Sequence, residues 1–252
     1  MEFPSALNDA VLKHKYPLVF ATVSGAHLYG FPSPDSDFDL RGVHVFPVRD
    51  LLGLDEPDDT IEISSFEGGI ELDLVTHDLK KFILLMLRPN GYVLEQLLSP
   101  LVVHTTPEHE ELKALASDCI TRHHVNHYVG FANSQWRLFA GETVHRVKPL
   151  LYVFRILLTG IHLMKTGIIE ANLNILNEQF KLSYLPELIE QKRTSNEQST
   201  LDSVRLKFYE SEFQRLLDEL KQASIDSSLP ELASARPALN DLLGRVRLQT
   251  LS

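Results

Sequence analysis

A strand, a glycine turn and a second strand that begins with two carboxylates limit the fold more than any other part of this chain. Residues 16–24 form a continuous apolar run rich in β-branched side chains, which predicts a buried strand. A turn follows at Gly25, and residues 38–46 have the pattern of the next strand. Asp37 and Asp39 stand one residue apart at its head. Because side chains alternate between the two faces of a strand, we expect both carboxylates to point the same way, with Cα atoms about 7 Å apart.

A third carboxylate, Asp73, lies on a later strand. Residues 70–76 alternate cleanly, so that Ile70, Leu72, Leu74 and Thr76 share one face and Glu71, Asp73 and Val75 share the other. Magnesium ions prefer carboxylate oxygens and also bind substrate phosphates. In the plain alternative, the three aspartates are only turn and surface residues. The glycine turn and the strand position of Asp73 favour a metal-binding triad of Asp37, Asp39 and Asp73, able to hold two ions about 4 Å apart.

A calcium-binding EF-hand is the competing metal site to consider, because Asp35, Asp37 and Asp39 resemble the start of such a loop. An EF-hand loop needs glycine at its sixth position and glutamate at its twelfth. Counted from Asp35, this chain has Leu40 and Phe46 at those positions. The EF-hand is therefore excluded.

The hydrophobic period changes from strand-like to helical at Asp78, a suitable N-cap for a helix. Helices are expected over residues 79–87, 92–98, 108–127, 129–141, 149–167 and 201–223, with a short strand over 60–66 and a polar loop over 191–200. The sequence predicts an α+β protein with a mixed sheet of four or five strands flanked by helices. We place a sheet-bearing catalytic domain at 1–106 and a helical domain that closes the cleft at 107–252.

Composition narrows the classes of protein that remain. Hydrophobic residues make up 44% of the 252 residues, enough for a packed core. The net charge of −10 argues against a broad basic surface for nucleic acid, although a local basic groove is allowed. Cys119 is the sole cysteine, and the first residues lack the pattern of a signal peptide. The apolar run over 150–158 is interrupted by Arg155 and is too short to span a bilayer. We expect a cytoplasmic protein with no membrane partner.

The residues around the turn carry a family resemblance. Gly25 and Tyr29-Gly30, followed by Pro34 to Gly42 (PDSDFDLRG) and later by Asp73, resemble the DNA polymerase beta nucleotidyltransferase superfamily. They are most similar to a bacterial and phage group of nucleotidyltransferases, some of which are encoded with RNA-repair enzymes. The match covers roughly residues 17–100, and the helical half matches more loosely.

This resemblance implies a reaction and a role for each residue. It implies transfer of a nucleoside monophosphate from an NTP such as ATP to a hydroxyl, with release of pyrophosphate. Asp37 and Asp39 would bind two Mg²⁺ ions, for which Mn²⁺ can substitute, and Asp73 would complete the site and help to deprotonate the acceptor hydroxyl. Gly25 would begin the phosphate-binding turn. The polymerase-beta fold, with a nucleotidyltransferase sheet followed by a helical domain, is implied as well.

One position departs from the superfamily pattern. The superfamily usually has Gly-Ser at this turn, and the serine hydroxyl contacts the triphosphate, whereas this chain has Gly25-Ala26. Ser24 is adjacent but not equivalent. Backbone N–H groups at Ser24, Gly25 and Ala26 still offer phosphate a cradle, so these three residues are the predicted phosphate-binding segment.

Basic residues on an apolar helix form a second candidate group. Lys148, Tyr152 and Arg155 fall at helical spacing on one stripe of the segment that begins near Pro149. Basic groups on an otherwise buried helix need a partner. They could bind the triphosphate or the acceptor, or they could pair with core carboxylates or extend to the surface. Because related nucleotidyltransferases place a helical-domain lysine on the triphosphate, Lys148 ranks first of the three.

Three other side chains are expected to have structural roles. His123 and His127 stand at i and i+4, a spacing that zinc sites use, but no glutamate or cysteine accompanies them in a metalloprotease or zinc-finger pattern. We interpret them as a polar helix face. Arg41, two residues after Asp39, is expected to order the acidic strand.

The sequence does not specify the acceptor, the preferred base or the oligomeric state. RNA ends, tRNA, a protein hydroxyl and a small molecule are all compatible with the sequence. A catalytically weak nucleotide-binding regulator, or a partner in a toxin–antitoxin pair, is the alternative from another class. The three aspartates argue against such a regulator, and Ala26 argues for it.

Overall fold

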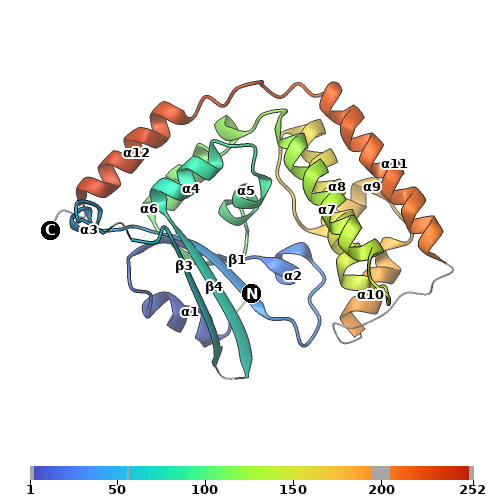
Figure 1. The fold of residues 1–252 in the computed structure, drawn as a ribbon, viewed down its shortest axis with the longest axis horizontal. Helices are drawn as coiled ribbons and strands as arrows, with labels where there is room; N and C mark the ends of the chain where they lie inside the picture. The colour runs from blue at the N-terminus through green and yellow to red at the C-terminus, as the bar shows by residue number, and fades with distance from the viewer. Residues whose placement is uncertain (1–2, 56, 68, 195–204, 250–252) are drawn as a thin grey trace. The chain divides into compact units, whose positions relative to one another are not determined.

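A five-stranded mixed sheet lies in the first half of the chain. The computed structural model describes residues 3–55, 57–67, 69–194 and 205–249 (Figure 1). Its sheet order is β3-β4-β2-β1-β5, in which β2 and β4 run parallel and the other neighbours are antiparallel. The strands are β1 Leu18–Val23, β2 Phe38–His44, β3 Thr60–Glu67, β4 Ile70–Asp78 and β5 Val102–Thr105. The predicted α+β class, with a mixed sheet and a helical region after it, is confirmed.

The chain forms two compact units, each made of segments that are not contiguous in sequence. The sheet unit comprises the described parts of Met1–Gly25, Asp37–Cys119 and Ala233–Ser252. The helical unit comprises Ala26–Ser36 and the described part of Ile120–Leu232. A division at residue 106 stays a prediction about domains, whereas these contacts place the C-terminal helix with the sheet.

Helices cover both faces of the sheet within the sheet unit. They are α1 Ser5–Leu12, α3 Val48–Leu51, α4 Leu79–Met86, α5 Gly91–Leu97, α6 Pro107–Ala114 and α12 Arg236–Gln249. Leu7 of α1 packs in the core formed by Leu40, Leu72 and Leu74 on one face. On the opposite face Phe20 meets Phe82 of α4 edge-on, with ring centroids 5.4 Å apart. The residues that alternate with the buried leucines of β2 and β4 therefore face the α4 and α5 side.

Side-chain caps fix where α4 and α5, the two helices between β4 and β5, begin. The Asp78 carboxylate accepts from the backbone N–H of Lys80 at 2.9 Å, and the Asn90 side chain accepts from that of Tyr92 at 3.1 Å. Each bond satisfies a backbone donor that has no partner within the helix. The predicted helices over 79–87 and 92–98 agree with α4 and α5 to within about one residue at most ends, the usual uncertainty of helix limits.

Some predicted elements are wrong in their limits. The helix expected over 108–127 is two helices, because α6 ends at Ala114, a 3₁₀ turn covers Ser117–Cys119 and α7 starts at His124. The strand β5 was not predicted. The polar loop expected over 191–200 begins as the last turn of α10, and its remainder lies outside the described residues, as do Gly68 and residues 201–204.

The helical unit is built around one long buried helix. Its helices are α2 Gly25–Tyr29, whose first residue belongs to the sheet unit, α7 His124–Ala140, α8 Val147–Thr166, α9 Leu173–Phe180, α10 Leu185–Thr194 and α11 Leu206–Ile225. Gly160 of α8 is needed for close packing, because a Cβ there would lie 2.9 Å from Tyr128 of α7 and 3.0 Å from Leu220 of α11. Gly167, at a φ of 75°, ends α8 in the left-handed region that favours glycine.

The length of α8 corrects one expectation. The 20-residue helix continues through Arg155, and by length and composition it is long and apolar enough to cross a membrane. However, 78% of its apolar window is buried inside the folded unit. Its apolar character is thus used in the core, where Arg155 itself is 1% exposed.

Candidate active site

Two of the three predicted carboxylates lie side by side on neighbouring strands. Asp39 of β2 and Asp73 of β4 are register partners in the parallel pair. Register partners point to the same face of a sheet, here the α4 and α5 side. The Asp39 side chain is 23% exposed and that of Asp73 is 37% exposed, so both remain accessible to a ligand.

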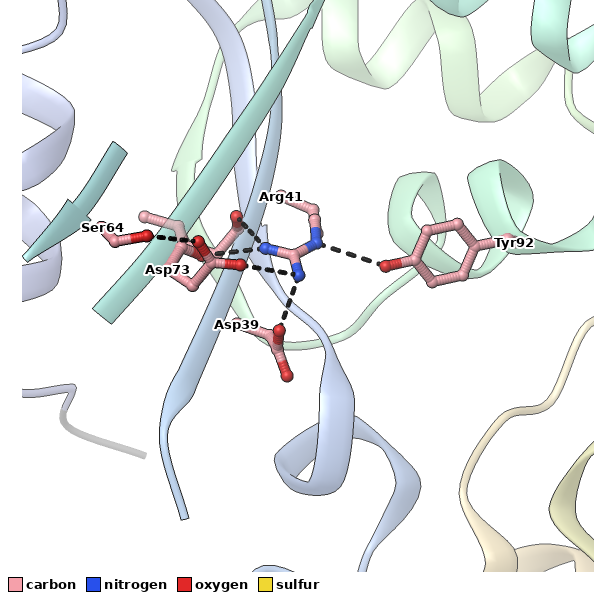
Figure 2. Close-up of polar contacts among 6 residues, drawn as sticks. Asp39, Arg41, Ser64, Asp73 and Tyr92 are labelled. Carbon is pink, nitrogen blue, oxygen red and sulfur yellow. Dashed lines mark hydrogen bonds and ion pairs between the residues drawn. The ribbon is translucent and has the colours of Figure 1, made fainter. Parts of the chain in front are cut away.

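The guanidinium of Arg41 lies between these carboxylates (Figure 2). Its Nη2 donates to Asp39 Oδ1 at 2.6 Å and to Asp73 Oδ2 at 3.2 Å. Its Nη1 donates to the backbone carbonyls of Leu40 at 3.0 Å and Asp73 at 2.8 Å, and its Nε donates to the Tyr92 hydroxyl at 3.2 Å. The arginine expected to order the acidic strand thus joins β2, β4 and α5.

Opposite charges make this arrangement stable despite burial. Burial disfavours the charge on Arg41, but the Tyr92 hydroxyl and the carboxylates of Asp39 and Asp73 outweigh it and raise the pKa of the guanidinium. Ser64 Oγ donates to the other oxygen of Asp73 at 3.1 Å. Hydrogen bonds with an ionised partner are roughly twice as strong as neutral ones, so the two carboxylates are held in defined positions.

Asp37 occupies a different setting from Asp39. The strand β2 begins at Phe38, so Asp37 lies in the preceding loop, where it is half-buried. The expectation that strand alternation points both carboxylates the same way therefore does not apply to it. Within the ranges that the structure describes, no three His, Cys, Asp or Glu side chains gather as a metal site. Metal binding by Asp37 together with Asp39 and Asp73 stays a prediction.

The chemistry of the paired carboxylates fits a hard divalent cation. Asp39 and Asp73 offer oxygen ligands from adjacent strands, the donor type that Mg²⁺ prefers. A positive group already bonds both, namely the guanidinium of Arg41. The pair is therefore arranged around a cation.

Gly25 allows Asp39 to approach the turn. A Cβ at position 25 would lie 1.9 Å from Asp39 Oδ2, and the φ of Gly25 is +60°. The backbone N–H of Ser24 donates to the Asp39 carbonyl at 2.8 Å. Any other residue at position 25 would collide with the carboxylate and would be strained. Sequence reasoning assigned Gly25 to phosphate binding alone, and the structure adds a second reason for glycine here.

The predicted phosphate-binding segment leads into a short helix. Ser24 follows β1, and the five-residue helix α2 starts at Gly25. Ser24 is 1% exposed, and its Oγ has no hydrogen-bond partner among the residues that the structure describes. A buried hydroxyl without a partner costs about 1–3 kcal/mol unless a ligand or water satisfies it. Ala26, 4% exposed, lacks any such group.

The three predicted residues of the helical unit all lie on α8. Lys148 is half-buried in its first turn. The ring of Tyr152 lies edge-on to those of Tyr29, 5.4 Å away, and Phe31, 5.6 Å away. The guanidinium of Arg155 lies 4.0 Å from the centre of the Tyr29 ring. Tyr152 and Arg155 thus pack on the segment Ala26–Ser36, and nucleotide binding by these three residues stays a prediction.

Sequence reasoning missed the residues that anchor the segment Ala26–Ser36. Asn174 Nδ2 and Arg193 Nη2 donate to the Gly30 carbonyl at 2.7 and 2.9 Å. The fully buried Lys192 donates from Nζ to Ser33 Oγ. No local pattern announces these contacts, because the partners are more than 140 residues apart in sequence.

His123, directly before α7, and His127, within it, lie in different environments. His123 is exposed and bonds Glu231 at 3.0 Å. His127 is half-buried, and burial, followed by His124 and Arg155, lowers its pKa to about 4. The interpretation as a polar helix face fits His123 and is wrong for His127.

Fold and site together define a class of protein. A mixed sheet that presents paired aspartates on adjacent strands, followed by helices, is the arrangement that the resemblance to DNA polymerase beta implies. The comparison with known families then gives the particular group. Residues 3–245 match the family described as "RNA repair pathway DNA polymerase beta family", and the chain belongs to this family. The predicted family resemblance is confirmed, and membership suggests a nucleotidyltransferase.

Two relatives of this chain span most of its length. The "Uncharacterized protein MJ0002" of Methanocaldococcus jannaschii is 30% identical over 210 residues, which cover 80% of this chain and 83% of the relative. The "Uncharacterized protein YcgL" of Bacillus subtilis is 26% identical over 248 residues, which cover 93% of this chain and 89% of the relative. These similarities extend through both units.

Proposed function

We propose that the protein transfers a nucleoside monophosphate from an NTP to a hydroxyl group and releases pyrophosphate. The observation that carries the proposal is the register pairing of Asp39 with Asp73 on parallel strands, where both carboxylates face one cationic group. Membership of a DNA polymerase beta family supports the same reaction type.

The carboxylates divide the work of the reaction. Asp37, Asp39 and Asp73 would hold Mg²⁺, or Mn²⁺ in its place, which supplies charge neutralisation on the triphosphate and activation of the attacking oxygen. A bond forms between the acceptor oxygen and the α-phosphorus. The bond from the α-phosphorus to the oxygen that joins it to the β-phosphorus breaks, and this oxygen leaves with the pyrophosphate. Asp73 takes part in removing the acceptor proton. Its hydrogen bonds from Ser64 and Arg41 fix the position of the carboxylate for this role.

Nucleotide binding is assigned to the residues predicted for it. Gly25 and Ala26 would hold phosphate oxygens through backbone N–H groups. The Ser24 N–H is bonded to the Asp39 carbonyl, so Ser24 would contribute its buried hydroxyl. Lys148 on α8 would offset charge on the leaving pyrophosphate. Tyr152 and Arg155 remain the other proposed nucleotide-binding residues.

RNA is the acceptor that we favour, because the family is described by an RNA repair pathway. The net charge of −10 disfavours a wide phosphate-binding footprint, so we propose contact with a short segment around one RNA hydroxyl. A protein or small-molecule hydroxyl are the competing acceptors.

Label transfer tests the proposal. The protein is incubated with each α-labelled NTP, Mg²⁺ or Mn²⁺, and separate RNA, protein and metabolite pools. We expect label to move to the RNA pool, and this transfer to vanish in Asp37→Ala and Asp39→Ala. Transfer that persists unchanged in both variants would remove the mechanism. NTP binding without transfer to any pool would favour the regulator instead.

A further inference from the structure

Arg41 has the bonding pattern of a built-in cation. Its Nη2 bonds both Asp39 and Asp73, so a side chain of the protein partly neutralises each carboxylate. The Arg41 side chain is only 12% exposed, whereas Asp39 and Asp73 are 23% and 37% exposed. The positive charge therefore lies beneath two carboxylates that are open to solvent.

The guanidinium does not depend on the carboxylates for its position. Nη1 donates to two backbone carbonyls, those of Leu40 and Asp73, and Nε donates to the Tyr92 hydroxyl. These three bonds would remain if Nη2 lost both of its carboxylate partners. The arginine can thus stay in place when another cation takes over its bonds to the carboxylates.

We propose that Arg41 weakens the binding of bare divalent ions to the Asp39–Asp73 pair and favours the binding of an ion that arrives in complex with a polyphosphate. This inference rests on the proposed function. A bare Mg²⁺ must displace Nη2 and then lie next to a fixed positive charge, which repels it. A complex of Mg²⁺ with a nucleoside triphosphate is negative overall, so the same charge attracts it. Arg41 thereby makes metal loading depend on the nucleotide.

A purely structural arginine would behave differently. Its replacement would lower the free energy of unfolding but would change metal affinity equally with and without nucleotide. Arg247 provides the matched control, because its side chain is 11% exposed, bonds the Asp78 carboxylate and donates to the Phe46 carbonyl at 2.8 Å in the same unit. The two arginines have nearly equal burial and similar kinds of partner.

The test measures Mn²⁺ binding by electron paramagnetic resonance, with and without a non-hydrolysable NTP analogue. In Arg41→Gln we expect bare Mn²⁺ to bind about tenfold more tightly than in the wild type, because a nearby charge is gone. Binding of Mn²⁺ with the analogue should weaken severalfold. Arg247→Gln should lower the melting temperature and leave both affinities unchanged.

Two further variants test the same role of Arg41. Arg41→Lys retains the charge and should bind bare Mn²⁺ as weakly as the wild type does. If Arg41→Gln does not fold, Tyr92→Phe removes the Nε bond alone and should tighten bare Mn²⁺ binding two- to threefold, the effect of roughly half a kcal/mol. Equal affinities in wild type and in these neutralised or loosened variants would overturn the role of Arg41.

The same titration separates this inference from the proposed function. Absence of Mn²⁺ binding in the wild type and in every variant, with and without the analogue, would overturn the metal-dependent reaction itself. Binding that depends on Asp39 but is unaffected by Arg41→Gln would overturn only the inference.

Discussion

Two arginine–carboxylate groups in the sheet unit look alike in bonding and differ in exposure. Arg41 bonds Asp39 and Asp73, and Arg247 bonds both oxygens of Asp78 at 2.6 Å. The arginine side chains are 12% and 11% exposed. The carboxylates are 23% and 37% exposed in the first group, whereas Asp78 is 6% exposed in the second.

The exposure of the carboxylate distinguishes a ligand-binding site from an ion pair that only stabilises the fold. Asp78 caps α4 and ties it to the C-terminal helix α12 through Arg247, so all of its bonds are internal. Asp39 and Asp73 bond an internal cation and keep part of their side-chain surface exposed. A buried ion pair is costly to break, but an ion pair with exposed carboxylates can exchange its cation. The following substitutions test this difference.

The largest effect is expected from Asp39→Asn. The amide keeps the shape of the side chain but loses the negative charge that binds the cation, so nucleotidyl transfer should fall by at least about a thousandfold, or about 4 kcal/mol of barrier. Pyrophosphate release under single-turnover conditions measures it. The melting temperature should change by only a few degrees, since Asp73 still neutralises Arg41. If Asp39→Asn instead unfolded the protein while the folded molecules kept their activity, Asp39 would be a structural residue and the comparison would be wrong.

Asp78→Asn should have the opposite outcome. Loss of this charge removes the ion pair between Asp78 and the buried Arg247 and should lower the free energy of unfolding by about 3 kcal/mol. Urea denaturation measures it. The rate of transfer per folded molecule should equal that of the wild type, and a catalytic defect in fully folded Asp78→Asn would contradict the assignment of this pair to structure.

Low pH should lower the free energy of unfolding through a group near the Arg247–Asp78 pair. Burial lowers the pKa of His44 to about 4, even though Asp78 opposes this shift. Its folded pKa lies below the usual 6.5, so the unfolded chain binds more protons as the pH falls from 6.5 towards 4, and stability is lost over that window by up to about 3 kcal/mol. Urea midpoints at pH 7.5 and pH 5 measure the loss. His44→Gln should flatten this dependence, and an unchanged slope would remove His44 as its source.

Tyr92→Phe is expected to have the smallest effect. It removes one hydrogen bond, from Arg41 Nε to the hydroxyl, and should lower the free energy of unfolding by about 1 kcal/mol. Arg41 keeps its bonds to backbone and carboxylates. Thermal denaturation at neutral pH measures the change. A loss as large as that of Asp78→Asn would mean that Tyr92 holds the site more firmly than the geometry indicates.

Local patterns explain why part of this site could be predicted. Strand alternation placed Asp73 opposite the buried Leu72 and Leu74, and the structure confirms that face. The cap Asp78 fixed the start of α4 for the same reason, because a cap acts within a few residues. The role of Arg41 in ordering the acidic strand also follows from a neighbour two residues away.

Long-range pairings could not be predicted from the sequence. The parallel register of β2 with β4 brings Asp39 to Asp73, and nothing in either strand specifies that pairing. Arg247 meets Asp78 across 169 residues, and no periodicity marks such a contact. The break between α6 and α7 was missed because Leu112, Ala116 and Ile120 continue an apolar helical spacing through it.

Crystals soaked with Mn²⁺ and a non-hydrolysable NTP analogue offer the most direct test of the central claim, that the Asp39–Asp73 pair exchanges its cation. Anomalous diffraction locates the manganese. The account predicts a manganese peak bonded to Asp39 and Asp73, with Arg41 Nη2 released from them and still anchored by Nη1 on the backbone. A crystal that binds the analogue but shows manganese only at other carboxylates, with both Nη2 bonds intact, would contradict it.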